Sequence, residues 1–201
     1  MQTTNQRRMN TKKMVLAAVM TALVIIFQLL ATFTAFFGPF STAMALIPIA
    51  VGATMCGVSV GGWLGLVFGL VVLLSGGANL FLAFDIPGTF VTVLAKGLAC
   101  GLAAGLVYKL LEKANRYIAA VAAAVICPVV NTGVFLLGCA LFFLDDAAKI
   151  AEAVGLADKA GMGVFLALAM ANFALELATN IVLSPVVVRI LNIRKKTSAE
   201  R

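Results

Sequence analysis

The sequence predicts an all-α integral membrane protein, a bundle of six transmembrane helices with the N- and C-termini in the cytoplasm. Of the 201 residues, 63% are hydrophobic and only 11% are charged, and the mean hydropathy is +1.10. Soluble domains are about 45–50% apolar and about 25% charged, so this chain has too few polar residues to cover a folded surface in water. Because one membrane-spanning helix needs about 20 apolar residues, the hydrophobic residues suffice for roughly six spans.

The net charge of +7 is distributed as in a membrane protein. With the N-terminus inside, the outer segments carry Lys149 and Lys159, and Lys96 lies within a span. The inner segments carry the other twelve basic residues, which are Arg7, Arg8, Lys12, Lys13, Lys109, Lys113, Arg116, Arg189, Arg194, Lys195, Lys196 and Arg201. Because an excess of Lys and Arg marks the cytoplasmic side, the charge predicts the topology, and we expect no nucleic-acid partner.

Residues suited to catalysis or metal binding are scarce. Histidine, the commonest general base and metal ligand, is absent. The four cysteines, Cys56, Cys100, Cys127 and Cys139, lack paired metal-ligand spacing and fall in apolar stretches, which is typical of small buried side chains. We therefore expect no enzyme activity, no metal and no cofactor.

The first predicted span, at 14–34, follows a basic cytoplasmic tail at 1–13 and is too long for the apolar core of a signal peptide. The six spans together form a membrane domain at 14–192, and a second basic cytoplasmic tail, 193–201, follows it.

The second and third spans are predicted at 42–58 and 60–74. No charge separates them, and Ser59 with Gly61-Gly62 is expected to make the turn of an antiparallel hairpin. The remaining spans are predicted at 89–111, 117–144 and 162–191.

Small residues and prolines predict how these helices pack. Glycines recur at every fourth residue on the third and fourth helices, at Gly61, Gly65, Gly69, Gly97, Gly101 and Gly105. This spacing lets backbones approach closely in lipid, and packing within the bundle is the expected role. Pro128 and Pro185 are expected to interrupt the fifth and sixth helices, either as plain kinks or to expose polar groups to a solute.

Polar side chains within the spans are the candidates for function. Lys96, Asn172, Asn131 and Glu176 lie about 10, 15, 18 and 21 Å below the outer ends of their helices, at about 1.5 Å per residue. A charged side chain at a helix centre costs at least about 2.5–3.5 kcal/mol in lipid, so it faces the bundle interior or water. We expect an outward-facing solute pocket, in which Lys96 favours a carboxylate or phosphate. The alternative is a buried Lys96–Glu176 pair that only locks two helices.

Two segments are long enough to cover such a pocket from outside. Residues 76–88 are expected to form a loop, in which Asn79 and Asp85 are further candidate binding residues. Residues 145–161 form a polar connection that is expected to contain a short interfacial helix. Gln28, on the first helix, is also polar but has no assigned role.

Five segments share a wider pattern: the basic start that leads into 13–22, then 47–53, 61–70, 128–133 and 180–185. In this order they resemble the S components of energy-coupling factor (ECF) transporters, the substrate-binding membrane subunits that serve vitamin uptake in prokaryotes. The resemblance covers nearly the whole chain.

The resemblance implies a prokaryotic plasma membrane protein with six helices and a solute site near the extracellular side, formed by outer loops and helices four to six. It implies a transmembrane scaffold subunit and two cytoplasmic ATPases as partners, besides the solute and membrane lipid. Ala18 and Ala22 match the small-residue pattern through which the first helix of this family contacts the scaffold. ATP hydrolysis is expected in the partners, consistent with the lack of a GxxxxGK[ST] motif here.

The expected function is therefore capture of a small water-soluble vitamin or related micronutrient, and Lys96 favours an acidic one such as pantothenate. Two alternatives stay open. One is a stand-alone secondary transporter with Glu176 as its proton site, and the other is a structural membrane protein that binds no solute.

Overall fold

The computed structural model describes the backbone of residues 2–34 and 43–199, and the side chains of residues 11–33, 44–170, 172–174 and 176–182. The described residues form α-helices and one turn of 3₁₀ helix, in chain order α1 (Gln2–Thr34), η3 (Ala43–Ala45), α2 (Leu46–Cys56), α3 (Val58–Leu74), α4 (Asn79–Leu82), α5 (Ile86–Leu111), α6 (Arg116–Phe142), α7 (Ala147–Ala153) and α8 (Met162–Ala199).

Within the described residues, four helices are long and apolar enough to cross a membrane, at Thr11–Phe33, Ile86–Leu111, Arg116–Phe142 and Met162–Val182. The helices α2 and α3 are also apolar but have only 11 and 17 residues. At about 1.5 Å per residue they extend for about 16 and 25 Å, against a hydrocarbon core of about 30 Å. The prediction of an all-helical, multi-pass membrane protein is confirmed, whereas the count of six spans is not.

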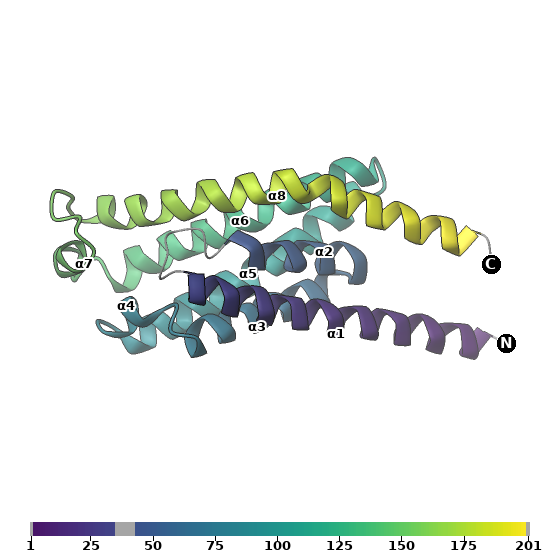
Figure 1. Ribbon diagram of the computed structural model, residues 1–201, viewed down its shortest axis with the longest axis horizontal. Coiled ribbons are helices and arrows are strands. Elements are labelled where there is room, and N and C mark those ends of the chain that lie inside the picture. The colour runs from purple at the N-terminus through teal and green to yellow at the C-terminus, as the bar shows by residue number, and fades with distance from the viewer. Residues whose placement is uncertain (1, 35–42, 200–201) are drawn as a thin grey trace.

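The first turn of α1 and the last turn of α8 lie at the same end of the bundle, and α4 and α7 lie at the opposite end (Figure 1). The helix α1 already begins at Gln2, within the predicted tail. The helices α6 and α8 continue through Pro128 and Pro185, so neither proline ends its helix. A proline removes one backbone hydrogen bond, and a long helix in lipid keeps its remaining bonds because no water replaces them.

The turn between α2 and α3 lies at Gly57, and not at Ser59 and Gly61-Gly62 as expected. Gly57 has φ 105°, a conformation that a residue with a Cβ rarely adopts. Its N–H donates to Ala53 O at 3.0 Å, and its carbonyl accepts from Gly61 N at 3.0 Å. One residue thus ends α2 and starts α3, which leaves Gly61 and Gly62 inside α3.

The segment 76–88 is more helical than expected from the sequence. It contains α4 and the first turn of α5, which begins at Ile86. Pro87 suits the first turn of a helix, where its missing N–H has no partner to lose. Asp85 occupies the position before α5, and its carbonyl accepts a hydrogen bond from Thr89 Oγ1 at 2.6 Å. The helix α4 and the first turn of α5 thus occupy much of the segment expected to be a loop.

The glycines of α3 and α5 bring the two helix backbones into direct contact, as expected. A Cβ added to Gly65 would overlap the carbonyl of Gly97, and one added to Gly61 would overlap the carbonyl of Gly101. Such contacts replace side-chain packing with close backbone packing, which favours helix association in lipid. The α3–α5 seam, by which we mean these facing glycines, fixes the position of α5 and of Lys96 beside Gly97.

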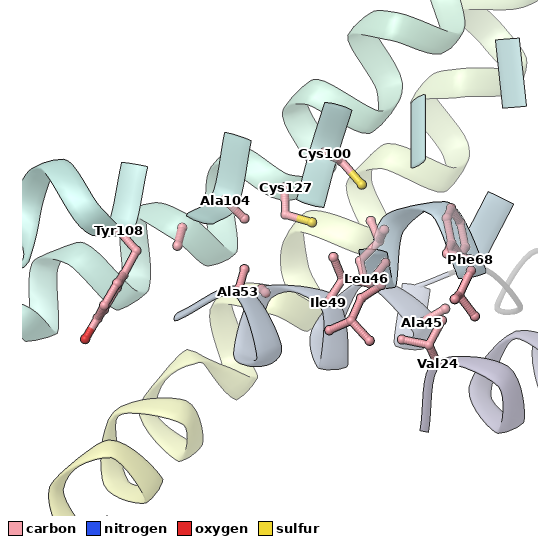
Figure 2. Packing of buried hydrophobic residues seen from close by; sticks show 14 of the residues in the cluster. Val24, Ala45, Leu46, Ile49, Ala53, Phe68, Cys100, Ala104, Tyr108 and Cys127 are labelled. Carbon is pink, nitrogen blue, oxygen red and sulfur yellow. The ribbon is translucent and has the colours of Figure 1, made fainter. Parts of the chain in front are cut away.

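Two clusters of buried apolar side chains hold the bundle together. The larger one joins α1, α2, α3, α5 and α6, and Figure 2 shows it from Tyr108 at one end to Phe68 at the other. The smaller one, around Phe143, Ile150 and Phe165, packs α7 and α4 onto α6 and α8. On α7, Lys149 Nζ donates to Asp146 Oδ1 at 2.6 Å, and this hydrogen bond raises the pKa of Lys149 above its usual value.

Candidate functional site

A cavity of about 820 Å³ lies among α1, α3, α5, α6 and α8, towards the end of the bundle that carries α4. Its polar lining residues are Gln28, Thr32, Ser75, Asn79, Lys96, Asn131, Thr132, Asn172 and Glu176, and its apolar and glycine lining residues are Val72, Gly76, Gly77, Leu80, Phe81, Phe135, Leu168 and Ala169. The volume is within the range of about 300–1,000 Å³ that is usual for small-molecule sites.

A hydrogen-bonded pair joins α6 and α8 at this cavity. Asn131 Nδ2 donates to Glu176 Oε2 at 3.4 Å, and Asn180 Nδ2 donates to the backbone carbonyl of Glu176 at 2.9 Å. Asn131 is 5% exposed and Glu176 is 3% exposed, so the pair is removed from lipid. The side-chain oxygen of Asn131 accepts no hydrogen bond within the described structure. The pair therefore offers unused acceptor capacity to a group with an N–H or O–H.

The ammonium of Lys96 lies over aromatic rings. Its Nζ is 5.3 Å from the ring centroid of Phe135 on α6 and 6.0 Å from that of Phe68 on α3. The faces of aromatic rings attract cations at such distances. Among the described residues, the ion pairs within 4.0 Å are Lys149–Asp146 and Lys159–Asp158, so Lys96 and Glu176 share the cavity without a direct ion pair.

The cavity collects most of the polar residues that the sequence singles out. Lys96, Asn131, Asn172 and Glu176 all line it, and Asn79 joins them from the first position of α4. Asp85 does not line it: this residue precedes α5, and its backbone carbonyl accepts a hydrogen bond from Thr89 Oγ1.

Ala18 and Ala22 do not line the cavity, and both are exposed on α1. Exposed apolar side chains adjoin them on the same helix, at Val15, Val19 and Ile26. This face is free for lipid or for another membrane protein.

Sequence reasoning left several cavity residues out of the candidate site, among them Phe81, Phe135 and Gln28. Phe81 and Phe135 are apolar in an apolar chain, so no pattern distinguishes them from ordinary core residues. Their edge-to-face contact, with centroids 5.4 Å apart, is visible only in three dimensions. Gln28 had a signal, because it is an amide within an apolar stretch, but its helix is not among those expected to bind the solute.

The fold and the cavity define a multi-pass helical membrane protein with a cavity lined by both polar and apolar residues. The family model of the ECF transporter substrate-specific component matches residues 12–188, so the chain belongs to this family. Its members are substrate-binding membrane subunits, which associate with an energy-coupling module of scaffold and ATPases and bind a small solute. No curated protein and no solved structure matches the chain.

Proposed function

We propose that this chain captures a small, water-soluble, acidic solute of the vitamin type, such as pantothenate, at the extracellular side of a prokaryotic plasma membrane. The observation that carries the proposal is Lys96, which lines a cavity of about 820 Å³ and makes no ion pair within 4.0 Å with any residue whose side chain the structure describes. An ammonium in a lipid-embedded bundle needs a counter-charge or water. A carboxylate on the solute supplies the counter-charge.

The other lining residues fit the remainder of such a solute. Asn131 and Glu176 present acceptors from α6 and α8, while Asn79 and Asn172 each add an amide that can donate or accept. Phe135 and Phe81 give the cavity an apolar wall. This mixture of one cation, several acceptors and aromatic surface suits an acid with hydroxyl or amide groups.

The direct test is solute binding by the purified chain. Mass spectrometry of small molecules retained through purification identifies the natural solute, and calorimetry with pantothenate measures affinity. A hydrogen bond to a charged group contributes about 1.5–3 kcal/mol, so we expect Lys96→Met to weaken binding at least about tenfold. Lys109→Met, at an exposed lysine in the last turn of the same helix, is the matched control. Unchanged affinity in Lys96→Met refutes the acidic-solute proposal.

Delivery of the solute depends, in this proposal, on ATPase-driven partners that contact α1. The exposed face around Ala18 and Ala22 is the proposed contact with the scaffold subunit. The double variant Ala18→Leu/Ala22→Leu is expected to bind solute normally and to abolish uptake in cells that hold the complete transporter. Ala140→Leu, on an exposed face of α6, is expected to leave uptake intact. Uptake that survives the double variant contradicts this contact.

A second candidate is proton-coupled transport by the chain alone, which one observation favours: Glu176 is buried and makes no ion pair within the described structure. Reconstitution of the lone protein in vesicles with a proton gradient and no ATP separates the two candidates. Uptake of pantothenate under these conditions, and its loss in Glu176→Gln, support the stand-alone transporter.

A further inference from the structure

Gln28 is a buried amide on the α1 side of the cavity. The residue is 2% exposed and lines the cavity, and its Oε1 accepts no hydrogen bond within the described structure. Its Nε2 makes one long contact, 3.5 Å from Thr32 Oγ1. A buried acceptor without a donor lowers the stability of the fold, so its presence requires a reason.

The surroundings of Gln28 do not supply a structural partner for this oxygen. The hydroxyl of Thr32 already donates towards the backbone carbonyl of Gln28 at 3.1 Å and lies 2.9 Å from Ser75 Oγ, which ties α1 to the end of α3. That contact persists without the amide of Gln28. A leucine would fill the same space in the apolar stretch 23–31 and would leave no oxygen unpaired.

Among the described residues, the two buried amide oxygens that line the cavity and lack a hydrogen-bond partner come from different walls. Gln28 belongs to α1, which packs on α2 and α3, and Asn131 belongs to α6, which packs on α5 and α8. Glu176 adds a carboxylate on the wall of Asn131. Buried acceptors without a donor in the described structure therefore lie on both walls of the cavity.

We infer that Gln28 is a solute-contacting residue, which accepts a hydrogen bond from an N–H or O–H of the solute on the wall formed by α1. The inference rests on the proposed function and narrows its substrate class. The solute carries at least two hydrogen-bond donors, one for the wall of α1 and one for the wall of Asn131 and Glu176. Hydroxy acids and amide acids meet this requirement, while a flat aromatic acid without donors does not.

The test compares three solutes by calorimetry. Pantothenate has a carboxylate, an amide N–H and two hydroxyls; nicotinate has a carboxylate and no donor; pantothenol keeps the donors and replaces the carboxylate with an alcohol. We expect Gln28→Leu to weaken pantothenate binding about tenfold, the effect of one hydrogen bond, and to change nicotinate binding less than twofold. Without solute, Gln28→Leu is expected to unfold at the wild-type temperature or above it, because the variant removes an unpaired buried oxygen.

Thr92→Val is the matched control. Thr92 is 4% exposed and its Oγ1 also lacks a hydrogen-bond partner within the described structure, but the residue does not line the cavity. Its valine variant is expected to keep the wild-type affinity for pantothenate. A lower unfolding temperature of solute-free Gln28→Leu, or an equal loss of affinity for pantothenate and nicotinate, overturns the inference in favour of a packing role.

The same measurements separate the inference from the proposed function. If Lys96→Met weakens pantothenate binding and Gln28→Leu does not, the acidic solute stands and the role of Gln28 fails. If pantothenate and pantothenol bind equally, and Gln28→Leu weakens both, the role of Gln28 stands and the acid fails. If the wild-type chain binds none of the three, both are overturned.

Discussion

The α3–α5 seam predicts a graded response to the smallest possible substitution, glycine to alanine. A Cβ on Gly65 would overlap the backbone carbonyl of Gly97 on the opposite helix. A Cβ on Gly69 would lie 2.9 Å from Val93 O, which is tight but less severe. A Cβ on Gly133 would meet nothing within 4 Å. The three sites have the same chemistry and differ in the space that the neighbouring helix leaves.

The size of the expected loss in stability depends on how rigid the contacted group on the opposite helix is. The atom that Gly65→Ala meets is a backbone carbonyl, which cannot rotate away, so the two helices have to separate by about 1 Å to restore ordinary contact distances. Overpacking of this kind costs about 1–3 kcal/mol. In a chain of this size, each kcal/mol lowers the unfolding temperature by about 2–4 °C. We expect a clear drop for Gly65→Ala, a smaller one for Gly69→Ala, and none for Gly133→Ala.

A thiol-reactive dye in detergent provides the assay. Cys100, Cys127 and Cys139 have no exposed surface and become reactive only when the bundle opens. Cys56 is partly exposed, so the series is made in a Cys56→Ser background. Equal unfolding temperatures for Gly65→Ala and Gly133→Ala refute the backbone contact between α3 and α5.

Three further outcomes are expected. Asn115→Ala removes the side chain that accepts hydrogen bonds from Tyr117 N at 2.8 Å and Ile118 N at 3.3 Å, so the free energy of unfolding, measured with the same dye, should fall by about 1 kcal/mol; no change contradicts the cap. Phe81→Ala removes ring contacts to Phe135 and Phe143, and hydrogen exchange of the amides in α4 should become faster, while unchanged exchange shows that these contacts do not hold α4. Asp85→Asn should leave pantothenate affinity within twofold in calorimetry, because Asp85 lies outside the cavity lining, and a larger loss would return this residue to the site.

The sequence predicts those parts of the fold that depend on local pattern. Apolar stretches locate the long helices, and the four-residue spacing of glycines identifies the contact between α3 and α5. The end of α2 and the start of α5 are harder to predict from the sequence, because each depends on one residue with special backbone chemistry. Gly57 can end α2 with a positive φ, and Pro87 can start α5, but glycine and proline are equally compatible with a loop.

In the candidate site, too, the residues that break a local pattern can be predicted, and those placed by helix packing cannot. Lys96, Asn131, Asn172 and Glu176 are visible in the sequence because each violates the apolar pattern of a span. Gln28 violates it too, but its place across the cavity depends on how α1 packs, which no local pattern contains. The aromatic surface beneath Lys96 is invisible in a chain with 14 phenylalanines, because nothing local distinguishes Phe135 from the other thirteen.

The arrangement of Lys96 and Glu176 bears on whether the cavity exists to bind something. Two opposite charges that only lock helices together are stabilised by direct contact, because each separated charge in a low-dielectric interior retains a desolvation penalty of several kcal/mol. Here the ammonium lies over Phe135 and the carboxylate accepts from Asn131, and the two groups make no ion pair. Both line the same cavity, where water or a solute can solvate them. The proposed solute, an acid with several donors, would satisfy both groups at once, whereas a pair that only locks helices needs no cavity around it.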